Sequence, residues 1–142
     1  MFKSLSDREI GLSAILPYIG TWYSWGGDNP DGFDCSGLAI EFLKSVNKFP
    51  RSLDGTAQDL WARYKSQRVD KPSRGCLVFW KNSEGKAIHV EVMLNNHLAI
   101  GASGGGSKTT TKEAAIKANA FVKVRSIYTR KNILGFIDPF KK

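Results

Sequence analysis

The chain has 142 residues, enough for one domain with a substantial core, and its apolar content of 42% excludes a globally disordered chain. A net charge of +8 favours polyanionic partners, although a well-solvated surface explains it equally well. The basic residues concentrate in segments 63–74, 108–131 and 141–142. No nucleic-acid motif accompanies them, so we predict no nucleic-acid partner. No apolar run reaches bilayer-spanning length, so we predict no membrane insertion.

The first ten residues mix charged with apolar side chains, which is not the pattern of a secretory signal peptide. We therefore expect synthesis in the cytoplasm. The two cysteines, Cys35 and Cys76, are not expected to form a disulfide there. Neither belongs to a Cys/His group with metal-ligand spacing, so we predict no metal and no cofactor. Cys76 opens the apolar run 76–80, where we interpret it as a small core residue.

Three helices are predicted in the first half of the chain, over 6–16, 35–46 and 57–66. Ser6 is a candidate N-cap for the first, and Thr56 with Asp59 resembles a capping arrangement for the third. Between them, 26–32 has the composition of a loop, and 49–52 is expected to be an exposed connection.

Strands are predicted in the second half, over 77–80, 88–94, 98–102, 121–127 and 134–137. Turns at 82–85 and 95–96, a Gly/Ser loop at 103–108 and a short helix at 111–118 connect them. Helices followed by an antiparallel sheet indicate a single α+β domain over 1–142, with the N-terminal helices packed on the C-terminal sheet.

Cys35 is placed where the second helix should begin. A thiol there lies near unpaired backbone N–H groups and the positive end of the helix dipole, which favour the nucleophilic thiolate. His89 begins an apolar run in the middle of the sheet region, whereas His97 adjoins a turn and should be partly exposed. A strand histidine facing a helix-terminal cysteine would form the nucleophile–base pair of thiol acyl transfer. The backbone N–H of Cys35 would stabilise the oxyanion.

The surrounding motifs closely resemble those of the NlpC family of cell-wall cysteine peptidases. They are Tyr23-x-Trp25-Gly26-Gly27, Phe33-Asp34-Cys35-Ser36-Gly37, Gly75 to Trp80, and His89-Val90, in that order. The resemblance implies a papain-like α+β fold, with the catalytic cysteine at a helix N-terminus. It also implies hydrolysis of peptide bonds in peptidoglycan stem peptides, commonly after γ-D-glutamate.

Within this resemblance, Cys35 matches the nucleophile and His89 the base. Asp34 and Ser36 match positions that bind the free amine of the stem peptide, and Asp34 could also cap the helix. Tyr23 matches an aromatic residue whose hydroxyl lines the site, whereas Trp25 is interpreted as structural.

The chain departs from the family pattern at the third polar residue, which usually orients the imidazole from the following strand. That position is Gly101, and hairpin geometry with a two- or three-residue loop places Ala102 or Gly101 opposite His89. Glu91, on the same face of the strand as His89, is the preferred substitute, although it could equally be a solvated strand residue. Ser103 is a diagonal neighbour, and a backbone carbonyl or a water could also orient the ring. Cys76, where the family usually has Asp, is interpreted as a packing change.

Two functional hypotheses follow from this sequence. The first is a peptidoglycan hydrolase, an endopeptidase or amidase that we expect to be phage-encoded. It would act on the wall as an endolysin after lysis, or as a virion component in contact with tail proteins; a secreted effector toxin is a further option. Its positive charge would help it adsorb to anionic wall polymers. The second is a non-catalytic peptidoglycan-binding or tail structural module that retains the fold.

Overall fold

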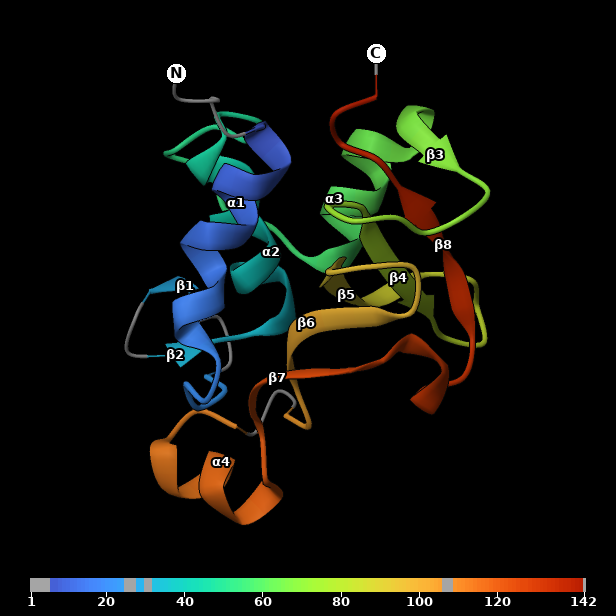
Figure 1. Ribbon diagram of the computed structural model, residues 1–142. Coiled ribbons are helices and arrows are strands. Elements are labelled where there is room, and N and C mark those ends of the chain that lie inside the picture. Colours follow the sequence, from blue (N-terminus) through green and yellow to red (C-terminus); the bar gives the residue numbers. More distant parts are fainter. Residues whose placement is uncertain (1–5, 25–27, 30–31, 106–108, 142) are drawn as a thin grey trace.

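The computed structural model describes residues 6–24, 28–29, 32–105 and 109–141, and it shows helices packed against a six-stranded antiparallel sheet (Figure 1). The helices are α1 (Asp7–Ile15), α2 (Cys35–Ser45), α3 (Ala57–Tyr64) and α4 (Lys112–Ala118), with 3-10 turns η1 (Leu16–Tyr18), η2 (Lys65–Gln67) and η3 (Ile127–Thr129). The strands of the sheet, in spatial order, are β3 (Arg68–Val69), β8 (Ile133–Ile137), β4 (Leu77–Lys81), β5 (Ala87–Met93), β6 (Leu98–Ser103) and β7 (Phe121–Ser126).

The helices begin at the capping residues that the sequence indicates. The Ser6 side chain accepts the Glu9 N–H at the start of α1, and Thr56 and Asp59 form a reciprocal capping box at the start of α3. The Thr111 side chain caps α4 in the same way. Within the described ranges, no helix is both long enough and apolar enough to cross a membrane. These local signals explain why the helical boundaries agree with the prediction to within about two residues.

The central strands are buried on both faces. Alternate residues of β4 and β5, such as Phe79 and Val90, join the core beneath α1, α2 and α3, and the residues between them, such as Val78 and Met93, form a second apolar cluster on the other face. Figure 1 shows α1 and α2 together on one side of the molecule and the sheet on the other. α2 packs on β5 and β6, which brings its N-terminus to the strand that carries His89.

Three features differ from the prediction. The expected loop 26–32 contributes to a small hairpin, β1 (Asp28–Asn29) and β2 (Gly32–Phe33). β3 is an additional edge strand that pairs with β8. The 49–52 connection is not fully exposed, because Phe49 is buried in the core beneath the cationic groups of Lys44 and Arg63.

The register of β5 with β6 also differs from both expected alternatives. Val92 pairs with Ile100 and Met93 with Ala99, which continues to Glu91 opposite Gly101 rather than His89 opposite Gly101 or Ala102. The cause is the connection, where the Asn95 side chain accepts the N–H groups of His97 and Leu98 and so builds a longer loop than was assumed. This register determines which side chains can reach His89.

Candidate active site

Cys35 is the first residue of α2, as expected, and is half-buried. Asp34 caps the helix, and its Oδ1 accepts the Gly37 N–H at 2.6 Å and the Ser36 hydroxyl at 3.3 Å. The capping interpretation of Asp34 is therefore confirmed. The cap fixes the direction of the first turn and hence the position of the thiol. The Gly37 N–H is occupied by this cap, whereas the N–H of Cys35 at the start of the helix can stabilise an oxyanion beside the sulfur.

His89 lies in β5 with only 5% of its surface exposed. Its ring packs against Trp80, the residue opposite it on β4, with ring centroids 5.2 Å apart. The Nε2 atom lies 2.7 Å from Oε2 of Glu91, which is itself only 4% exposed. Since Glu91 occupies Nε2, the other ring nitrogen, Nδ1, is left for Cys35.

The charge state of His89 follows from these contacts. Burial lowers its pKa by opposing the charged form, but hydrogen bonds to the Cys35 and Glu91 side chains, and the charges of those two groups, outweigh burial and raise the pKa to about 9. The imidazolium form is therefore retained at neutral pH, beside the sulfur of Cys35 and the carboxylate of Glu91. This arrangement suits a group that must deliver a proton to a leaving amine.

The position of Glu91 depends on the absence of a side chain at Gly101. A Cβ atom built on Gly101 would lie 2.6 Å from Cδ and 2.9 Å from Oε2 of Glu91, closer than real Cβ contacts. Glu91 therefore occupies the space that a side chain at Gly101 would fill. Of the sequence-based alternatives, the interpretation of Glu91 as a solvated residue is wrong, and its contact with His89 is present.

The other polar candidates have different hydrogen-bond partners or are exposed. Ser103 is buried, and its hydroxyl accepts a hydrogen bond from Arg125 on β7. His97 is exposed beside its turn, with Nδ1 2.9 Å from Oδ1 of Asn96. Cys76 is fully buried in the second apolar cluster, as expected. Trp25 lies outside the described residues.

Tyr23 is buried, and Gly105 approaches its ring so closely that a Cβ there would overlap it. Burial, together with the neighbouring Cys35 and Asp34, raises the pKa of the Tyr23 phenol. Its hydroxyl is therefore protonated at neutral pH and can donate a hydrogen bond to a ligand.

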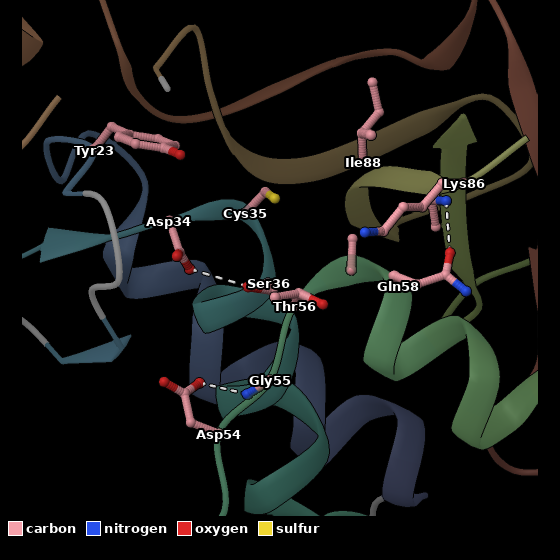
Figure 2. Close-up of a pocket in the computed structure, with 12 residues that line it drawn as sticks. Tyr23, Asp34, Cys35, Ser36, Asp54, Gly55, Thr56, Gln58, Lys86 and Ile88 are labelled. Carbon is pink, nitrogen blue, oxygen red and sulfur yellow. Dashed lines mark hydrogen bonds between the residues drawn. The ribbon is translucent and has the colours of Figure 1, made fainter. Parts of the chain in front are cut away.

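A cavity of about 590 Å³ opens over Cys35 (Figure 2). Tyr23, Asp34 and Ser36 line it on one side of the thiol, so the structure brings these three predicted residues together with Cys35. His89, which is 5% exposed, is not among the residues that line the cavity.

Of the opposite wall, the sequence suggests only that the loop 48–55 helps to shape the pocket. That wall consists of segment 54–58, which includes the start of α3, and of Lys86, Ala87 and Ile88 at the start of β5. One signal was available, since Lys86 precedes His89 by three residues and follows the predicted 82–85 turn. The end of loop 48–55 does reach the cavity, whereas residues 56–58 had no such signal, because only tertiary packing brings them beside Cys35.

Comparison with known proteins places this geometry in a family. The NlpC/P60 family model matches residues 20–126. The chain is 31% identical over 95 residues to "Probable peptidoglycan endopeptidase LytE" of Bacillus subtilis, covering 67% of this chain and 27% of that protein. It is 31% identical over 111 residues to "Dipeptidyl-peptidase 6" of Lysinibacillus sphaericus, covering 75% of this chain and 36% of that protein. The chain thus spans about a third or less of the length of these two relatives.

Among solved structures, the peptidoglycan hydrolase RipB from Mycobacterium tuberculosis aligns with a TM-score of 0.70 at 24% identity, covering 96% of this chain and 65% of that one. This likeness confirms the predicted papain-like α+β fold. The family match extends over well over half of the chain and includes Cys35, His89 and Glu91. The chain belongs to the NlpC/P60 family.

Proposed function

We propose that this protein hydrolyses amide bonds in the stem peptides of peptidoglycan, with Cys35 as nucleophile and His89 as acid and base. The observation that carries the proposal is the juxtaposition of a helix-terminal thiol with a buried imidazole that a carboxylate holds at 2.7 Å. Relatives whose names refer to peptidoglycan endopeptidases support the substrate class.

In the proposed reaction, the Cys35 thiolate attacks the scissile carbonyl carbon, and the backbone N–H of Cys35 stabilises the oxyanion that forms. The His89 imidazolium donates its proton to the leaving amine, and the C–N bond breaks to leave a thioester. Neutral His89 then accepts a proton from water, which attacks the thioester and releases the carboxylate product and the thiolate. Both half-reactions use the same two side chains.

Glu91 is proposed as the positioning residue of this pair. Its carboxylate accepts a hydrogen bond from Nε2 and so selects the orientation in which Nδ1 serves Cys35. The alternative of a non-catalytic binding module was based mainly on the missing third residue, and the buried Glu91 contact weakens that argument.

On the substrate side, Asp34 and Ser36 are proposed to bind the free amine of the stem peptide, and the Tyr23 hydroxyl is proposed to donate a hydrogen bond to an oxygen of the same peptide. The Asp34 carboxylate lines the cavity and can therefore attract an ammonium group while it caps α2. The bond that we propose to be cleaved is the one that follows γ-D-glutamate. Delivery to the wall as a phage endolysin, tail component or effector stays a prediction from the sequence.

The test is digestion of purified peptidoglycan by the wild type and by Cys35→Ala, with the released fragments identified by mass spectrometry. We expect Cys35→Ala to lower the rate by at least about a thousandfold, because it removes the nucleophile. Cys76→Ala is the matched control and should keep activity if it remains folded. Fragment masses identify the bond.

A reactivity measurement separates a catalytic thiol from one that is only accessible. Cys35 should react with iodoacetamide at mildly acidic pH much faster than Cys76, and His89→Ala should slow that reaction although it leaves Cys35 exposed. No digestion of any wall by a folded protein, combined with slow labelling of Cys35 in both backgrounds, would refute the enzyme and favour the binding module.

A further inference from the structure

The cavity over Cys35 is electrically asymmetric. Asp34 lies on one side of the thiol, and the Lys86 side chain extends into the cavity from the other side (Figure 2). Asp54 also lines the cavity, but its Oδ1 accepts the N–H of Gly55 at the edge of the site. Among the described residues that line the cavity, Lys86 is the single basic one. A ligand that spans the thiol therefore meets a carboxylate at one end and an ammonium group at the other.

Hydrogen bonds hold both the N–H and the carbonyl of Lys86. Its N–H donates to Oδ1 of Asn82 at 3.0 Å, and its carbonyl accepts the Asn82 N–H at 3.0 Å. The next N–H, that of Ala87, donates to Oε1 of Gln58 at 2.8 Å, which ties the strand to α3. The start of β5 is thus fixed relative to the wall of the cavity, and the side chain of Lys86 projects from a rigid base.

The ammonium group of Lys86 is available to a ligand. Within the portion of the chain that the structure describes, the ion pairs are Arg8–Asp138, Arg74–Glu9 and His89–Glu91, so Lys86 belongs to none. The Asp59 carboxylate accepts the Thr56 N–H in the capping box. Hydrogen bonds from Thr56 are the main cause of the lowered pKa of Asp59, and the charge of Lys86 contributes least to that lowering. Asp59 is thus committed to the helix cap rather than to Lys86.

We propose that Lys86 is a specificity-determining residue that binds a free carboxylate carried by a residue next to the scissile bond. The inference rests on the proposed function. Two carboxylates of that chemistry are available in a stem peptide, namely the α-carboxylate of γ-linked glutamate and a carboxylate on the residue that leaves. An amide at either place would remove the negative charge, so Lys86 would distinguish acidic from amidated stem peptides.

The experiment uses four synthetic stem peptides that carry an acid or an amide at each of these two places. We expect the wild type to cleave one acid form about tenfold faster in kcat/KM than its amide, mainly through KM, because a charged hydrogen bond in a partly open site is worth that much. Lys86→Gln should abolish this preference, and Lys86→Arg should retain most of it. Lys81→Gln, an exposed lysine on the other arm of the same hairpin, is the matched control and should match the wild type.

The place at which amidation matters identifies the carboxylate. Equal rates for all four peptides in the wild type, or an unchanged preference in Lys86→Gln, would overturn the proposal while leaving the peptidase intact. Binding of the same peptides to Cys35→Ala, measured by calorimetry, tests Lys86 without turnover. Failure of the wild type to cleave any of them, together with selective binding lost in Lys86→Gln, would refute the peptidase and retain the carboxylate site.

Discussion

At the scale of single residues, the group that orients the His89 imidazole comes from a different strand than the family pattern expects. The family pattern expects the group that orients the imidazole on the strand after the catalytic histidine, where this chain has Gly101. Here Glu91, two residues after His89 on its own strand, reaches Nε2 through the space that Gly101 leaves open. The small residue and the acidic residue thus work as a pair.

The pH dependence of activity tests the role of Glu91. With the pKa of His89 near 9, above its ordinary value of 6.5, the proton is held through neutral pH and lost as pH rises through about 9. Activity that needs the imidazolium should therefore fall on that alkaline side. Glu91→Gln removes one of the groups that raise this pKa, so the alkaline limb of kcat/KM should move to lower pH, with the rate at neutral pH reduced roughly a hundredfold.

Glu84→Gln is the control for this measurement, because Glu84 is exposed in the turn before β5. Its pH profile should coincide with that of the wild type. An unchanged alkaline limb in Glu91→Gln would mean that the carboxylate does not hold the proton of His89.

A double-mutant cycle tests the pairing with Gly101. Gly101→Ala places a methyl group against the Glu91 side chain, so Glu91 must move, and we expect a loss of about 1–3 kcal/mol in the free energy of unfolding together with reduced kcat/KM. In a Glu91→Ala background the methyl group has room, and the same change should cost little. An equal cost in both backgrounds, measured by urea denaturation, would show that the glycine serves another purpose.

At the scale of elements, local chemistry predicted the helices well because their ends carry capping side chains. Ser6, Asp34, Thr56 and Thr111 each accept a backbone N–H at a helix start. The two-residue strands β1, β2 and β3 were not predicted, since so short a segment shows no alternation and exists only through its partner. The burial of Phe49 was likewise not predicted, because it depends on how the two flanking helices, α2 and α3, pack around it.

In the candidate site too, sequence identified some residues, and only the packing of distant elements revealed the others. Motifs identified Cys35 and His89, and the period of a strand placed Glu91 beside His89. The contact of Glu91 with His89, together with the hydrogen bond of Arg125 to Ser103, decides between Glu91 and Ser103, a choice that sequence alone left open. The second wall of the cavity, with Lys86, required the packing of α3 against β5.

At the scale of the whole molecule, the basic segments recognised in the sequence lie at opposite edges of the sheet. Segment 63–74 runs through η2 and β3 at one edge, where the Lys141 Nζ donates to the Arg68 carbonyl. The described part of 108–131 forms α4 and β7 at the other edge, and then η3, after which the chain returns to β4. Several of these cations stack on aromatic rings, as Arg68 does on Trp61 and Lys123 on Phe121. The positive charge therefore flanks the molecule on both sides.

Adsorption to anionic wall polymers should therefore depend on salt. We expect the fraction of protein bound to purified walls to fall several-fold between about 0.05 and 0.5 M salt, because exposed charges are screened over that range. The two edges can be compared with matched pairs of exposed lysines, Lys112 with Lys117 on α4 and Lys65 with Lys71 on the β3 side, each pair changed to Gln. The pair that weakens adsorption more identifies the wall-facing edge, while cleavage of a soluble stem peptide should stay unchanged in both, since none of these lysines lines the cavity. Adsorption that is indifferent to salt and to both pairs would assign wall binding to the substrate cavity alone.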